Sequence, residues 1–195
     1  VQGMSLQVLD LAWPDLELNG IATGRLDYAW KGNRNGRLDL KVRGLSRSGL
    51  LLASQPIDVG IAAAVSGNQA ALRAVAASNG AVVGRAQARF APLGGGPLVA
   101  ELMNAPLFAQ LRYQGPADTL WRLTGSEVLD VSGPLAVGAD IGGRLADPQI
   151  RGSLRTQNAR VESAVTGMIV DQIASQARFV GPQLIFTQIA GKTSG

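Results

Sequence analysis

Apolar and polar residues alternate along much of the chain, most clearly in two neighbouring stretches, 24–30 and 36–43. Successive side chains of a β-strand point to opposite faces, so a repeat of two predicts strands with one apolar and one polar face. Residues 31–36 are rich in turn-forming Gly and Asn, so we expect a β-hairpin. The apolar positions of this pair are Leu26, Tyr28, Trp30, Leu38, Leu40 and Val42.

Further strands are predicted along the rest of the chain. The alternation continues through 57–65 and 82–90, with turn formers at 66–68 and 78–80. In the last third, glycines recur at gaps of roughly 9 to 15 residues, a spacing that suits short strands joined by turns. Because no unit repeats at a fixed period, the pattern favours an elongated all-β structure, mainly antiparallel, over a closed solenoid with identical rungs.

The repeat of two is interrupted at 92–97, where three glycines stand between two prolines and favour a loop. Leucines then recur near helical spacing over 98–112, and 116–123 can add another helical turn. These features predict a short helical insert over 98–124, made of one helix or two short ones, that covers the apolar face. The leucines expected against the sheet are Leu102, Leu107 and Leu111.

We therefore expect one elongated domain in three parts: a strand segment over 1–97, the helical insert over 98–124 and a continuing strand segment over 125–195. The chain begins without a charged, apolar leader and ends within a strand-like pattern, which favours a piece of a longer protein. No apolar run approaches the roughly 20 residues of a membrane-spanning helix. Any membrane anchor is expected outside this stretch.

Composition excludes several classes of chemistry. The chain has neither Cys nor His, which rules out thiol nucleophiles, disulfides, Cys or His metal sites and His general bases. Basic residues exceed acidic ones by 18 to 14, but the arginines fall one or two per predicted strand. Nucleic-acid binding would need them clustered beside exposed aromatic residues, so a solvated face is favoured. A weak attraction to anionic lipid head groups stays open.

Three short motifs suggest a catalytic or nucleotide-binding site, but the spacing or the surrounding sequence of each does not match what that site requires. The motif at 191–193 resembles the end of a phosphate-binding loop, but Phe186 stands where that loop needs its first Gly. The glycines at 94–96 lack the last Gly of a dinucleotide fingerprint. Asp15 and Glu17 favour a solvated turn over the paired carboxylates of glycoside hydrolysis. We therefore expect no enzyme, no catalytic residues, no metal and no cofactor.

The segment 143–152 has the form G-x-L-x-x-P-x-x-x-G and precedes an alternating strand. Together with neighbouring features, this order of short strands, helix and repeated strands resembles the TamB family. The resemblance is to the periplasmic C-terminal part of this inner-membrane subunit of the translocation and assembly module of Gram-negative bacteria. It is carried by 105–111, 133–135 and 143–152 and by the strand starts at Gly167 and Gly181.

The resemblance implies a β-taco, an open half-pipe curled from one long sheet, with an apolar interior and a polar exterior. It also implies a role in outer-membrane biogenesis, in which the groove conducts phospholipids between the inner and outer membranes or assists the assembly of outer-membrane β-barrel proteins. The family has no catalytic motif, so only the apolar character of the groove transfers to this chain. The expected groove lining is Leu26, Tyr28, Trp30, Leu38, Leu40, Val42, Val59, Ile61, Val82, Phe90, Leu135, Val137, Ile141, Ile150, Leu154, Phe179, Leu184 and Phe186.

The partners that the resemblance implies are phospholipid acyl chains, an outer-membrane barrel partner of the Omp85 class (TamA-like) and unfolded outer-membrane protein strands. The implied location is the periplasm, with an inner-membrane anchor outside this sequence. No nucleic-acid partner is expected, and exposed sheet edges predict some edge-to-edge self-association. The residues alone leave open a structural β-solenoid or adhesin-like stalk that closes its core with its own side chains and binds no ligand.

Overall fold

The computed structural model describes residues 2–11, 17–29, 34–47, 55–124, 126, 128–181 and 183–194. Trp30, one of the expected groove residues, lies outside this part of the chain. The strands are β1 (Met4–Ser5), β2 (Leu18–Ala29), β3 (Asn35–Arg47), β4 (Ile57–Ser66), β5 (Gln69–Ser78), β6 (Ala81–Phe90), β7 (Leu107–Pro116), β8 (Leu129–Ser132), β9 (Pro134–Arg144), β10 (Asp147–Ser163), β11 (Ile169–Val180) and β12 (Gln183–Ser194). The helices are α1 (Leu98–Asn104) and α2 (Ala117–Trp121), with short 3-10 segments η1 (Leu6–Leu11) and η3 (Arg122–Thr124).

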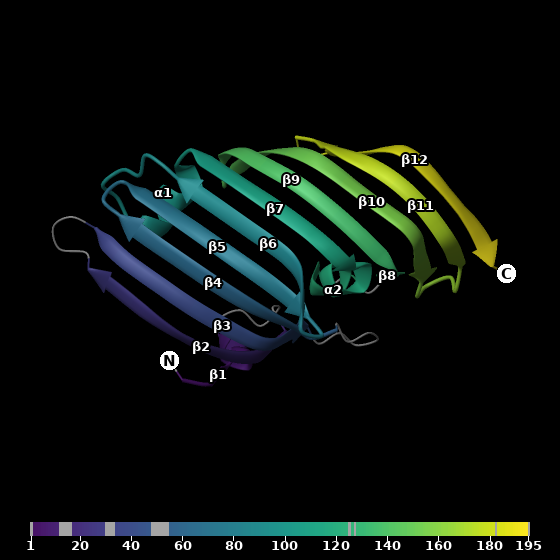
Figure 1. Ribbon diagram of the computed structural model, residues 1–195, viewed down its shortest axis with the longest axis horizontal. Coiled ribbons are helices and arrows are strands. Elements are labelled where there is room, and N and C mark those ends of the chain that lie inside the picture. The colour runs from purple at the N-terminus through teal and green to yellow at the C-terminus, as the bar shows by residue number, and fades with distance from the viewer. Residues whose placement is uncertain are drawn as a thin grey trace.

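The strands form one antiparallel sheet that does not close on itself. Each strand lies beside the next along the chain from β1 to β7, β9 follows β7, and the order continues to β12, while β8 pairs with β10. Figure 1 shows these strands side by side in a single curved layer, with β1 and β12 at opposite ends. The predicted all-β fold, an open curled half-pipe with short helices, is confirmed. Within the described ranges, no helix has the length and apolar character needed to cross a membrane.

The predicted hairpins form where the alternating stretches meet. Leu26 of β2 lies directly opposite Leu38 of β3, as the matched alternation requires. The turn between β5 and β6 places Asn79 and Gly80 at φ values of 50° and 79°, the left-handed region that Asn and Gly tolerate best. The turn signals at 66–68 and 78–80 therefore marked the strand ends correctly, whereas 31–33 of the first predicted turn lie outside the described residues and Asn35 and Gly36 already belong to β3.

Direct partners in an antiparallel pair share one face, so the register carries the alternation of each strand across the sheet. Two apolar rows cross ten strands, β2 to β7 and β9 to β12. The first row is Gly24, Leu40, Ile61, Ala74, Ala86, Leu111, Ala139, Gly152, Phe179 and Leu184. The second row is Ala22, Val42, Val59, Ala76, Gly84, Tyr113, Val137, Leu154, Ala177 and Phe186.

Three shorter rows extend this surface, and we call the five rows together the apolar face. None of their residues carries a charge, so the alternation of single strands adds up to one continuous uncharged surface. The shorter rows are Leu26, Leu38, Ala63, Leu72, Ala88, Ala109, Ile141 and Ile150; Tyr28, Gly36, Val65, Ala70, Phe90 and Leu107; and Gly115, Leu135, Thr156, Ser175 and Ile189.

The opposite side of the sheet, which we call the polar face, carries the charged residues of the same strands. Arginines there form short exposed ion pairs, with Arg25 2.7 Å from Asp27 and Arg37 2.8 Å from Asp39. Exposed pairs of this kind contribute little to stability, so their main effect is to keep this face of the sheet solvated. One row of the polar face is Arg25, Asp39, Ala62, Arg73, Gln87, Gln110, Asp140 and Arg151.

The segment 98–124 is not a continuous helical insert. Strand β7 lies between α1 and α2 and pairs with β6 on one side and β9 on the other. The expectation of helix up to residue 112 was wrong because Leu107 and Leu111 also fit a repeat of two, together with Ala109. Hydrogen bonding to two neighbouring strands outweighs the helical spacing of four leucines.

Helix α1 covers one corner of the apolar face. The carboxylate of Glu101 accepts hydrogen bonds from the amides of Gly94 and Gly96, at 2.5 and 2.9 Å, which lowers the pKa of Glu101 and ties the preceding loop to the helix. Leu102 packs against the sheet as predicted, whereas Leu107 and Leu111 belong to the sheet itself. The leucines of α1 and the residues around them in this cluster are Leu98, Leu102, Val65, Ala70, Phe90, Leu93 and Ala105.

Few large side chains are fully buried. Half of the buried apolar residues in the described part of the chain are alanines, and most larger side chains on the apolar face are only half-buried. A domain of this length normally buries most of its large apolar residues in one core. This sheet instead keeps a wide apolar surface within reach of solvent.

A substitution at Gly152 tests the close approach of β10 to β9. A Cβ atom at this position would collide with the carbonyl oxygen of Gly138 and lie 2.7 Å from Cα of Ala139. We expect Gly152→Ala to lower the free energy of unfolding by about 1–3 kcal/mol, because two backbones must separate. Urea denaturation followed by circular dichroism measures the change.

Gly60→Ala is the matched control, because a Cβ atom at Gly60 meets no other atom within 4 Å. This substitution should leave stability unchanged or raise it by roughly 0.5 kcal/mol, because Ala has less freedom than Gly in the unfolded chain. Equal effects at the two positions would contradict the close packing of β9 and β10.

Candidate functional site

The apolar face collects nearly all of the residues expected to line a groove. Register places them on this face even though they come from eight different strands. Trp30 lies outside the described residues, and Val82 is the other exception. The residues brought together are Leu26, Tyr28, Leu38, Leu40, Val42, Val59, Ile61, Phe90, Leu135, Val137, Ile141, Ile150, Leu154, Phe179, Leu184 and Phe186.

Val82 lies on the other side of the sheet. The pairing of β5 with β6 shifts by one residue between Ala76 and Ala77, so Val82 is opposite Ala77. Ala77 also pairs with Asp58, which belongs to the polar face. A one-residue bulge reverses the side on which the following residues lie, so the expectation that Val82 lines the apolar face was wrong.

Side chains at the two ends of the apolar face, on β2 and β12, are open to solvent, while most of those between them are partly buried. Leu26 is 69% exposed, and Phe186 and Ile189 near the other end of the sheet are 53% and 67% exposed. Removing apolar surface from water contributes about 25 cal/mol for each Å², so a ligand that covers these side chains gains binding free energy from them. The exposure identifies the apolar face as the candidate site.

A roofed part of the apolar face lies under α2 and η3, and we call it the α2 cavity. Its volume is about 400 Å³, within the range of small-molecule sites. No charged side chain of the described residues lines this cavity, and its lining residues come from both the helical segments and the sheet. The lining is Ala117, Leu120, Trp121, Thr124, Leu129, Val131, Leu135, Leu154, Thr156, Ala159, Val161, Ile173, Ser175, Leu184, Phe186 and Ile189.

Two polar contacts hold the roof of the α2 cavity in place. The Arg122 guanidinium lies 2.9 Å from the carboxylate of Asp130, and these side chains are only 18% and 20% exposed. The hydrogen bond to Asp130 raises the pKa of Arg122. The indole N–H of Trp121 donates to the carbonyl of Leu129 at 2.7 Å. Both contacts fasten α2 and η3 to β8, which is itself paired with β10.

Tyr113 anchors the start of α2 from the floor of the sheet. Its side chain is 5% exposed, and its hydroxyl donates a 2.6 Å hydrogen bond to the carbonyl of Pro116, the residue before the helix. Burial raises the pKa of this phenol. The amide of Ala117 donates to Gly133 at 2.7 Å, so both ends of the β7–α2 junction are fixed.

A smaller hollow of about 240 Å³ lies at the opposite corner of the apolar face, beside α1. Leu98 and Leu102 of α1 form one wall, and Leu38, Leu72 and Phe90 are among the sheet residues that form the floor. The two helices therefore stand over separate corners of the face. Neither helix covers the rows between these corners, but Leu6 of η1 packs on Ala22 and Val42 at the β2–β3 end of the face.

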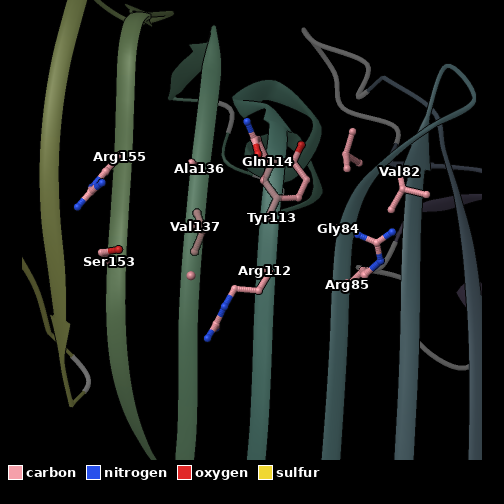
Figure 2. A pocket seen from close by; sticks show the side chains of 12 residues that line it. Val82, Gly84, Arg85, Arg112, Tyr113, Gln114, Ala136, Val137, Ser153 and Arg155 are labelled. Atoms are coloured by element: carbon pink, nitrogen blue, oxygen red, sulfur yellow. The ribbon is translucent and has the colours of Figure 1, made fainter.

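The polar face carries a shallow cleft of about 450 Å³, shown in Figure 2. Arg85, Arg112 and Arg155 reach it from β6, β7 and β10, and Ser153 forms part of its floor. Arg112 is engaged by Asp140, 2.9 Å away, and donates to the carbonyls of its own and a neighbouring strand. Guanidinium groups bind phosphate and carboxylate groups, and these arginines lie on the side of the sheet opposite the apolar face.

The short motifs that suggested a catalytic or nucleotide-binding site lie in parts of the structure that show no such site among the described residues. Residues 191–193 lie within strand β12 and not in a loop that could wrap a phosphate. Residues 94–96 form the loop held by Glu101. Asp15 lies outside the described residues. Among the described residues, no cluster of three acidic side chains could hold a metal ion.

Sequence reasoning missed the residues that complete the α2 cavity. Ile173 and Ser175 of β11 lie opposite a register irregularity in β10, and the pairing of β11 with β12 is irregular as well, so a simple repeat of two does not reveal which side they occupy. Tyr113 was missed because it lies within 98–124, which the sequence predicted to be a helical insert, whereas it belongs to strand β7. The sequence did contain one signal: Leu120 and Trp121 stand together as large apolar residues just after Pro116.

Comparison with known proteins gives no match: no family model, curated protein or solved structure corresponds to this chain.

The roof contacts can be tested with Asp130→Asn. Removing one charge from this half-buried pair should lower the free energy of unfolding by about 1–2 kcal/mol and increase hydrogen exchange of the α2 and β8 amides. Asp39→Asn is the control, because the pair with Arg37 is mostly exposed and its loss should change stability very little. Unchanged exchange in α2 and β8 after Asp130→Asn would contradict a fastened roof.

The raised pKa of Tyr113 predicts that the folded protein loses stability in alkaline solution. The folded state raises the pKa of Tyr113 above the value near 10 of an unfolded chain. Above about pH 10 the unfolded chain therefore loses a proton that the folded chain keeps, and the free energy of unfolding falls as pH rises.

In Tyr113→Phe this contribution disappears, together with the hydrogen bond to Pro116. We expect the variant to be less stable than the wild type by about 1 kcal/mol at pH 8 and the difference to shrink above pH 10. Urea denaturation at a series of pH values measures both effects. A difference that stays constant or grows with pH would show that the phenol is not held in its neutral form.

Proposed function

We propose that the apolar face binds the acyl chains of phospholipids, and that the chain is a segment of a TamB-like protein of outer-membrane biogenesis. The observation that carries this proposal is the set of uncharged rows, two of which run across ten strands, with exposed apolar side chains at both ends of the sheet. An acyl chain gains about 0.8 kcal/mol for each methylene group that leaves water. A surface of this kind needs shape and apolar area more than specific polar contacts.

The proposed role is conduction of phospholipids between the inner and outer membranes. Rows that continue from strand to strand let an acyl chain move along the sheet without crossing a charged side chain. In this role the protein works in the periplasm, anchored in the inner membrane by a segment outside this sequence, and meets a TamA-like barrel partner at the outer membrane. No catalytic residue or cofactor is part of the proposal.

A second candidate role is the binding of unfolded outer-membrane protein strands. The observation that favours it is strand β12, which within the described residues pairs only with β11. An extended peptide can add to such an edge through backbone hydrogen bonds. Phe186 and Ile189 of β12 are more than half exposed and would contact alternate side chains of the added strand.

Paired arginine substitutions separate the two faces of the sheet. Ala63 and Val137 lie on the apolar face, whereas their chain neighbours Ala62 and Ala136 lie on the polar face. An unpaired charge among acyl chains is costly, so Ala63→Arg and Val137→Arg should each reduce bound phospholipid by about tenfold or more. Mass spectrometry of organic extracts from the purified protein measures the bound lipid.

Ala62→Arg and Ala136→Arg are the matched controls and should retain lipid at the wild-type level. Circular dichroism and thermal unfolding confirm that all four variants fold. Lipid lost equally from both sets, or wild-type protein that is free of lipid, would contradict acyl-chain binding. The second outcome would favour strand binding at β12 or a structural spacer without a ligand.

A further inference from the structure

The α2 cavity contains one feature that acyl-chain binding in general does not explain. Ser175 is 4% exposed and lines the cavity, and its hydroxyl has no hydrogen-bond partner among the described residues. A buried hydroxyl without a partner costs free energy, so such a group calls for a partner from outside the chain.

The other polar groups of the cavity do not meet this need. The hydroxyl of Thr156 donates to the carbonyl of Pro134 and that of Thr124 to the carbonyl of Trp121. The indole N–H of Trp121 is taken by Leu129. Ser175 is therefore the polar side chain of the described lining that is left to bind a ligand.

We propose that the α2 cavity is a dedicated site for one acyl chain held through its neutral ester, whose carbonyl accepts a hydrogen bond from Ser175. This inference rests on the proposed function and adds a ligand group and a place to it. An ester carbonyl supplies the acceptor that Ser175 lacks, while the chain fills the apolar remainder of a cavity of about 400 Å³.

The charge of the cavity distinguishes an ester from a free fatty acid. No charged side chain of the described residues lines the cavity, so an ionised carboxylate would be buried there without a counter-charge. A neutral ester avoids this cost. The site should therefore select an esterified chain over the same chain as a free acid.

The α2 roof allows such a chain to be held locally instead of sliding along the open rows. Trp121, Leu120 and Ala117 cover the ligand from above, and Ile173 and Leu154 contact it from the sheet. The fastening of Arg122 to Asp130 keeps this roof closed. The cavity is therefore a holding point at one end of the apolar face.

The test compares monomyristoylglycerol with its ether analogue, O-tetradecylglycerol, which has a chain of the same length with a CH2 group in place of the ester carbonyl. Isothermal titration calorimetry on the wild-type protein should show tighter binding of the ester by about 3- to 10-fold, the usual effect of one hydrogen bond. Myristate at pH 8 should bind more weakly than the ester. This comparison requires no variant.

Ser175→Ala should reduce the ester-to-ether affinity ratio to about 1 while the ether analogue binds as before. Ser78→Ala is the matched control, because Ser78 is also buried, at 7% exposure, but lies outside the cavity. Without ligand, Ser175→Ala should keep or raise the melting temperature, because the variant lacks the unpartnered hydroxyl. A purely structural serine would instead lower it.

The outcomes separate this inference from the proposed function. Binding of ester and ether with equal affinity, unaffected by Ser175→Ala, would overturn the ester site and leave acyl-chain binding by the apolar face intact; it would also mean that a water molecule satisfies Ser175. Failure of all three ligands to bind would overturn both. A preserved ester preference in Ser175→Ala would overturn the role of Ser175.

Discussion

The antiparallel register is the constraint on which the rest of the structure depends. Because direct cross-strand partners share a face, the alternation within each strand combines into one uncharged surface across ten strands, with the arginines and aspartates on the other side. A surface of that extent is unfavourable in water. Helices of seven and five residues cover two of its corners, and Leu6 of η1 packs on Ala22 and Val42. Most of the other large side chains are partly buried, and those on β2 and β12 are exposed. The molecule is organised around a surface that it does not cover by itself.

Local departures from the regular ladder create the differences between the two ends of this surface. Near the N-terminal corner, α1 packs directly on the sheet and leaves a small hollow. Near the C-terminal end, register shifts interrupt the regular pairing of β10, β11 and β12, and a mostly buried ion pair holds α2 and η3 against β8. The result is an open apolar surface with a roofed cavity, in which the hydroxyl of Ser175 has no hydrogen-bond partner among the described residues. An acyl ligand would explain both the exposed apolar rows and the unpaired hydroxyl of Ser175.

The strands, the hairpin of β2 with β3 and the separation of faces could be predicted from the sequence, because a repeat of two is read residue by residue. Strand β7 could not, because Leu98, Leu102, Leu107 and Leu111 match helical spacing, and only pairing with β6 and β9 decides between the two structures. The bulge that moves Val82 to the polar face leaves no clear mark in the sequence, since it depends on how β6 meets β5. Ser175 was missed for a similar reason, because its place under α2 follows from contacts between distant segments.

Photo-crosslinking with phosphatidylethanolamine that carries a diazirine in one acyl chain is the most direct test that the apolar face holds lipid tails. Peptide mass spectrometry then locates the labelled residues. Acyl-chain binding predicts labels on alternate residues of β3, β4, β5, β9 and β10, with Leu38, Ile61 and Val137 labelled and their neighbours on the polar face unlabelled. Labels spread equally over both faces, or absent from the sheet, would contradict the account.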